Sequence, residues 1–174
     1  MSSKTILSNV IRLVVILLLQ ILVMKRIIVP FEGRPLFHIL IYPLFIIILP
    51  LKIPRPALML MAFAVGLLVD LFYTPLGIHA GALVFMAYMR PRVLRFLAPA
   101  DGYNMNYSPT IKRMGRPWFF KYAAILLFLH TFFYFSLEAY TFVYIVDILW
   151  QTATSFIISM IFIVVVMLIA NPQD

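Results

Sequence analysis

Residues 142–170 read FVYIVDILWQTATSFIISMIFIVVVMLIA and carry one charged side chain, Asp147. A helix needs about 20 mostly apolar residues to cross the hydrocarbon core of a bilayer. This stretch exceeds that length, and its continuous apolar surface would be costly to expose to water. The sequence therefore predicts a membrane-spanning helix over 142–170.

Five further apolar runs precede this one along the chain. They cover residues 8–29, 35–51, 57–72, 76–89 and 118–139. We expect a single domain over residues 1–174, an all-α membrane protein built as a bundle of six transmembrane helices. The run at 76–89 is short for a full crossing, so half of a re-entrant hairpin is the alternative there.

The composition fits lipid as the solvent of this chain. Of its 174 residues 64% are hydrophobic and 11% are charged, whereas soluble domains have roughly 45–50% and 25%. There is no cysteine, which excludes disulfides and thiolate metal sites. The net charge of +8 is expected to orient the chain in the bilayer rather than to bind nucleic acid.

Basic residues gather in the polar stretch that follows the fourth run. Because Lys and Arg near span ends favour the cytoplasmic side, loop 90–117 is expected inside the cell, with both termini on the same side. Eleven of the fourteen bases then lie inside, and Lys25, Arg26 and Arg34 lie outside. Residues 91–97 mix arginines with large apolar side chains. We interpret them as an ordinary basic flank, with an interfacial helix on anionic headgroups as the alternative.

Ionisable residues are rare inside spans, and each one is a functional hypothesis. Four acids fall on the predicted outer side, where the three outer bases could pair with them: Glu32, Asp70, Glu138 and Asp147. Such a cluster would position a ligand or a partner helix. Helix-end carboxylates near water are the alternative, favoured for Glu138 and evenly balanced for Asp70.

The last run also carries a polar stripe. Asp147, Gln151 and Ser155 recur every four residues and therefore share one helix face, with Thr154 and Ser159 alongside. Polar and small residues on one face usually join helices, so we favour packing over a substrate path. The preceding run repeats the spacing with His130, Tyr134 and Glu138, and a packing role is expected for the histidine.

Motifs of known enzymes are missing from the sequence. There is no metalloprotease, serine hydrolase, P-loop or dinucleotide signature. The histidines His38, His79 and His130 lie on different runs without a chelating pair. We therefore expect no enzyme, no metal site and no cofactor, which leaves an intramembrane enzyme as the weakest class.

Short motifs cluster around the third and fourth runs. Residues 66–72 read GLLVDLF, residues 75–82 read PLGIHAGA, residues 87–91 read AYMRP and residues 101–103 read DGY. This pattern resembles the rod shape-determining protein MreD, in the form found in Bacteroidetes-type bacteria. The resemblance is specific only over about residues 60–105.

The resemblance implies a non-enzymatic scaffold of cell elongation in the bacterial cytoplasmic membrane. That family binds MreC and helps to place RodA with its class B penicillin-binding transpeptidase, while the MreB filament lies on the cytoplasmic side. The residues carried over are Gly66, Asp70, Gly77, His79 and Arg90, and Asp147 and Gln151 join them from the polar stripe as candidates for structural or partner contacts.

Physical roles can be given to these residues without the family. Gly66 and Gly81 would allow close helix approach, and Pro75 with Gly77 suits a tight reversal. Asp70 could accept hydrogen bonds from the free N–H groups at the start of the fourth span.

The main rival is a substrate-binding subunit of an energy-coupling-factor vitamin transporter, which is similar in size and span count. Such subunits commonly dock their coupling partner through an Ala-x-x-x-Ala face on the first span. Residues 9–19 read NVIRLVVILLL and contain no alanine, and bulky side chains would block close docking. We therefore favour the scaffold.

Overall fold

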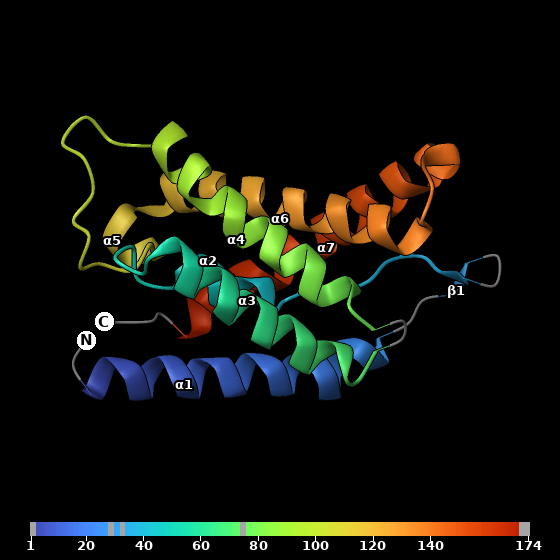
Figure 1. Cartoon of the computed structure of the whole chain (residues 1–174), viewed down its shortest axis with the longest axis horizontal. Coiled ribbons are helices and arrows are strands. Elements are labelled where there is room, and N and C mark those ends of the chain that lie inside the picture. The colour runs from blue at the N-terminus through green and yellow to red at the C-terminus, as the bar shows by residue number, and fades with distance from the viewer. Residues whose placement is uncertain (1–2, 28–29, 32–33, 74–75, 171–174) are drawn as a thin grey trace.

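The computed structural model describes residues 3–27, 30–31, 34–73 and 76–170, and it is almost entirely helical (Figure 1). For residues 3–6, 30–31, 34–35 and 170 it describes the backbone only. The helices lie roughly along one long axis. The expected all-α class is therefore confirmed.

The first apolar run forms one continuous helical rod. Helix α1 (Ser3–Leu18) passes into a π-helical turn, η1 (Leu19–Val23), and then into a 3-10 turn, η2 (Met24–Arg26). A small hairpin follows, in which β1 (Pro30–Phe31) pairs antiparallel with β2 (Arg34–Pro35).

The helix expected over residues 35–51 is wrong. Residues 37–41 have no regular structure, and only α2 (Pro43–Ile48) is helical. Every residue from Ile39 to Leu51 is nevertheless buried. The apolar composition of the segment correctly predicts that it is buried. It does not determine the backbone conformation, because side chains of neighbouring helices form hydrogen bonds with the N–H and C=O groups of the extended part.

Helices α3 (Arg55–Asp70) and α4 (Ile78–Phe96) form a tightly packed antiparallel pair. The expected start of the loop at residue 90 is wrong, because α4 continues through Pro91 for more than a turn. Carbonyls of its final turns are satisfied by side chains from the segment that follows: Tyr103 Oη donates to Leu94 O and Trp118 Nε1 donates to Leu97 O. Residues 91–96 thus belong to α4, so the basic flank is a continuation of that helix and not a separate interfacial helix.

The C-terminal half matches the expectation closely. After a short helix α5 (Ile111–Met114), α6 covers Arg116–Ala139, and a 3-10 turn η3 (Phe142–Tyr144) leads into α7 (Ile145–Ala170). Within the described residues three helices are long and apolar enough to cross a membrane, over Leu7–Arg26, Arg116–Ala139 and Phe142–Ile169.

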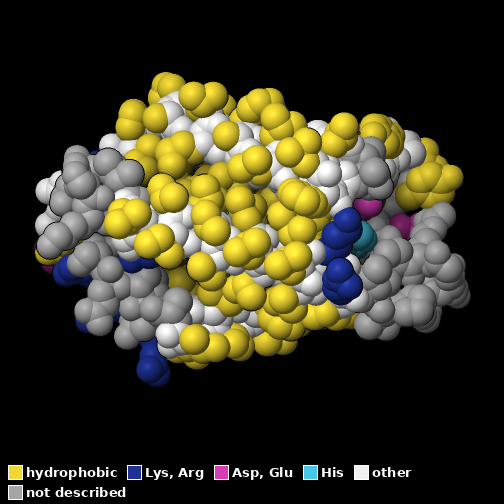
Figure 2. Space-filling model, turned by 90° about the horizontal axis from the view of Figure 1, so that it is seen from below, with side chains coloured by type: hydrophobic (Ala, Val, Ile, Leu, Met, Phe, Trp, Pro, Cys, Tyr) yellow, Lys and Arg dark blue, Asp and Glu magenta, His cyan; other side chains and the backbone are white. Residues whose placement is uncertain are grey.

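Polar groups gather at the two ends of the bundle. The start of α1, the end of α7 and helix α5 lie at one end, called here the basic end, and the β-hairpin and η3 lie at the opposite end (Figure 1). Figure 2 shows hydrophobic side chains covering the middle of one face, with Lys and Arg side chains toward both ends. This distribution is that of a protein whose middle lies in hydrocarbon.

Candidate functional site

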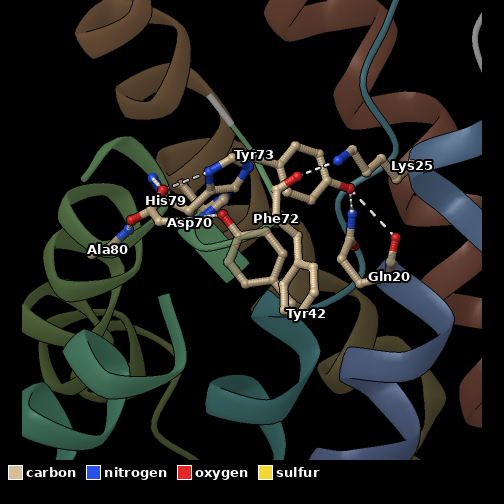
Figure 3. A network of polar contacts seen from close by, with 9 residues as sticks. Gln20, Lys25, Tyr42, Asp70, Phe72, Tyr73, His79 and Ala80 are labelled. Carbon is tan, nitrogen blue, oxygen red and sulfur yellow. Dashed lines mark hydrogen bonds and ion pairs between the residues drawn. The ribbon is translucent and has the colours of Figure 1, made fainter. Parts of the chain in front are cut away.

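A buried carboxylate joins α3 to α4 near the opposite end of the bundle (Figure 3). Asp70 is fully buried, and its two oxygens accept the backbone N–H of His79 and of Ala80, each at 3.0 Å. The His79 ring nitrogen Nδ1 lies 2.9 Å from the same carboxylate. The hydrogen bonds expected between Asp70 and the start of the fourth span are therefore confirmed.

Two glycines shape this junction. A Cβ on Gly66 would lie 2.4 Å from the Cα of Ala80, so the backbones of α3 and α4 can approach only because this position has no side chain. Gly77 precedes α4 with φ of +94°, a left-handed conformation that glycine adopts without strain. Pro75, also expected in the reversal, lies outside the described residues.

Aromatic rings enclose the His79 imidazole. Its centroid lies 4.6 Å from that of Tyr73, 4.9 Å from that of Tyr134 and 5.6 Å from that of Tyr42. The hydroxyl of Tyr42 in turn forms a 2.8 Å hydrogen bond with His130 Nε2. The packing role expected for this second histidine is thereby confirmed, although His79 Nε2 and His130 Nδ1 are buried without a partner among the residues that the structure describes.

Gln20 is a buried polar residue that sequence reasoning missed, as it missed the hydroxyls of Tyr42, Tyr73 and Tyr122. Its side-chain Nε2 donates to Ile39 O at 3.0 Å and to the Tyr73 hydroxyl at 2.9 Å, and its Oε1 accepts Ile41 N–H at 2.8 Å. The Gln20 amide therefore both donates a hydrogen bond to the extended backbone and accepts one from it. In the sequence, the signal for Gln20 was a single amide side chain within an apolar run. In the structure Gln20 lies in the π-helical turn η1, and such turns are frequent at functional sites.

The polar stripe of α7 also forms hydrogen bonds with this extended segment, at residues 36–40. Ser155 Oγ accepts His38 N–H at 2.9 Å and Ser159 Oγ accepts Leu40 N–H at 2.8 Å, while Thr154 Oγ1 donates to Leu36 O at 3.2 Å. The stripe thus has the packing role that we favoured, with an extended strand of chain as its partner. Unpaired backbone groups in an apolar interior would cost several kcal/mol each, on the order of 2–7.

Gln151 and Asp147 lie about one and two turns before Ser155 on α7 and do not take part in this pairing among the described residues. Together with His38 and Glu138 they line a cavity of about 360 Å³ at the opposite end of the bundle, which Tyr144 also borders. Asp70 does not reach this cavity. The expected outer cluster of acids is therefore divided, and Glu32 lies outside the described residues.

Among the described residues neither Lys25 nor Arg26 forms an ion pair with Asp70, Glu138 or Asp147, and the side chains of Arg34 and Glu32 lie outside the described part of the chain. Lys25 Nζ donates to the carbonyl of Phe72 at the end of α3 and lies 5.1 Å from the centre of the Tyr73 ring (Figure 3). A cation near a helix C-terminus stabilises the exposed carbonyls there.

Arg90 is buried inside the bundle, with 2% of its surface exposed. Its Nε donates to Tyr122 Oη at 2.7 Å and its Nη2 donates to Leu49 O, while Tyr122 Oη donates to Ile47 O at 3.1 Å. The two side chains therefore satisfy carbonyls at the C-terminal end of α2. Sequence reasoning placed Arg90 in a loop, and its partners come from about 30 and 40 residues away.

A scan against protein-family models returned no match for the chain, and searches of curated proteins and of solved structures returned none either.

Proposed function

We propose that this chain is a non-enzymatic scaffold of the bacterial cell-elongation machinery, of the MreD type, and that it binds MreC in the cytoplasmic membrane. The main support is that residues of the MreD-like motif pack against one another inside the protein. Gly66, Asp70, Gly77 and His79 all contribute to one packed junction between α3 and α4. Residues used for internal packing suit a protein that acts as a rigid platform.

We further propose six crossings, with both termini and the loop after α4 in the cytoplasm. An extended residue advances roughly 3.3 Å and a helical residue 1.5 Å. Residues 36–48 could therefore extend over about 30 Å, the thickness of the hydrocarbon core. Helices α3 and α4 lie along the same axis (Figure 1), and their lengths of 16 and 19 residues are near the lower limit for a crossing.

Membrane-facing apolar surface is available for a partner helix. Along α1 the side chains of Val10, Ile11, Val14, Val15 and Leu18 are about half exposed. In lipid such a surface gains nothing from burial as such, so a partner must bring shape complementarity or polar contacts. In the proposed scaffold, the single transmembrane helix of MreC packs on the bundle, and RodA with its transpeptidase assembles through that complex, with MreB on the cytoplasmic side.

The experiment is depletion in a rod-shaped host combined with co-purification. The scaffold predicts that depleted cells become round and that tagged protein retains MreC through detergent extraction. Normal shape after depletion, together with failure to retain MreC, would contradict the proposal. A tagged membrane protein of unrelated function and similar size controls for non-specific retention.

One observation favours the second candidate, a vitamin-binding subunit of an energy-coupling-factor transporter. The cavity of about 360 Å³ lined by His38, Glu138, Asp147 and Gln151 has the size and mixed lining of small-molecule sites. Mass spectrometry of small molecules released from purified protein distinguishes the two candidates. A vitamin recovered in a near one-to-one ratio would favour transport, and its absence together with MreC retention would favour the scaffold.

A further inference from the structure

A second cavity, of about 390 Å³, lies at the basic end between the start of α3 and the last turns of α4. Four basic side chains line it: Lys52, Arg55, Arg90 and Arg95. Among the described residues its lining includes no acid. We propose that this cavity binds the phosphate of an anionic phospholipid.

Charge is the first argument for this ligand. Lys52, Arg55 and Arg95 are exposed, and none of them forms an ion pair with an acid among the described residues. Like charges gathered around one cavity repel one another. An anion that enters the cavity removes this repulsion and adds charge-assisted hydrogen bonds.

Arg90 gives the cavity a fixed donor. Its Nε and Nη2 are held by Tyr122 Oη and Leu49 O, so the guanidinium plane cannot rotate freely. Its Nη1 forms no hydrogen bond within the described chain, although the residue lines the cavity. A rigid guanidinium with a free donor is suited to a phosphate oxygen.

The rest of the lining favours a lipid over free phosphate. Apolar side chains complete the wall, among them Leu51, Leu58, Leu94 and Met105. The lining mixes bases with apolar side chains at the basic end of the bundle, and in a bilayer such a boundary between apolar and charged surface is the level of the lipid headgroups. Basic pockets between helices at this level are typical of anionic lipid sites. The inference depends on the membrane position of the chain and not on the scaffold role.

The test is native mass spectrometry of the full chain in detergent, titrated with phosphatidylglycerol or with phosphatidylcholine of the same acyl chains. We expect retention of one phosphatidylglycerol and at least tenfold weaker retention of phosphatidylcholine. Each base near an anionic headgroup contributes a factor of roughly five. The double variant Lys52→Gln/Arg95→Gln should therefore bind phosphatidylglycerol about 25-fold more weakly.

The matched control is Lys112→Gln/Arg116→Gln, which removes the same charge around α5 at the same end of the molecule but outside the cavity. It should change phosphatidylglycerol binding by less than about twofold, since the lost charges do not face the cavity. Equal binding of the two lipids by the unmodified protein would overturn the proposal, and this comparison needs no variant to fold. Equal loss in both double variants would also overturn it. Displacement of the lipid by equimolar inorganic phosphate would assign the site to a soluble anion instead.

Discussion

The carboxylate of Asp70 lies 2.9 Å from Nδ1 of His79, and both side chains are buried at the junction of α3 and α4. The same carboxylate accepts the backbone N–H groups of His79 and Ala80. One side chain therefore ends one helix, starts the next and orients the imidazole between them. The stability of the hairpin should depend on it.

Replacing Asp70 by alanine should destabilise the protein. Three donors lose their acceptor in a buried site, which should lower the free energy of unfolding by at least about 3 kcal/mol. Thermal unfolding in detergent, followed by size-exclusion chromatography, measures the effect. The control is Asp101→Ala, which removes a carboxylate from an exposed loop position. If Asp70→Ala and Asp101→Ala were equally stable, the junction would not depend on the carboxylate.

Gly66→Ala tests the close approach of the two helices. The added Cβ would lie 2.4 Å from Ala80 Cα, which is backbone and cannot rotate away. Overpacking of this kind should cost about 2–3 kcal/mol. At Gly81 an added Cβ would meet only the end of the Leu137 side chain, at 3.0 Å, so Gly81→Ala is the milder matched variant. The order of the two unfolding temperatures is the measurement, and the reverse order would contradict the packing.

Gln20→Leu tests the pairing of the extended segment with the first helix. The substitution keeps the volume similar but leaves Ile39 O and Ile41 N–H without their partner. We expect a loss of about 2–4 kcal/mol of unfolding free energy. Gln151→Leu makes the same chemical change at a half-buried cavity position and should have a much smaller effect. Equal effects in the same unfolding assay would show that apolar packing alone holds the segment.

Arg90 should resist even a conservative substitution. Lysine cannot bridge Tyr122 Oη and Leu49 O as the guanidinium does, so Arg90→Lys should lower the unfolding temperature and Arg90→Gln should lower it further. Arg92 lies two residues away on the exposed side of α4, where it stacks on Tyr88. Arg92→Lys is the control and should be nearly neutral. A neutral Arg90→Lys would show that charge alone suffices.

The proposed orientation predicts the activity of reporter fusions. Alkaline phosphatase, which folds only outside the cytoplasm, should be inactive when inserted in the polar loop at residues 101–106 and active when inserted in the turn near residue 141. Both positions lie outside long helices, so an insertion there disturbs few contacts. The opposite pattern of activities would invert the proposed topology.

The sequence alone determined the long apolar helices and the hydrogen bonds of Asp70. Runs of about 20 apolar residues have few alternatives to a helix in lipid, because a helix satisfies its own backbone. Asp70 and its partners are nine and ten residues apart, so a tight reversal brings them together whatever the rest of the chain does. Local physics was sufficient in both cases.

Only the tertiary structure decided the conformation of residues 36–48 and the burial of Arg90. The extended backbone is stable because Gln20, Ser155 and Ser159 reach it from 19 to 119 residues away, and no pattern within residues 35–51 records those partners. Arg90 is buried because the carbonyl of Leu49, just after α2, and the hydroxyl of Tyr122 accept its hydrogen bonds there. In an apolar interior a polar group takes the conformation in which its hydrogen bonds are satisfied, and partners distant in sequence supplied them.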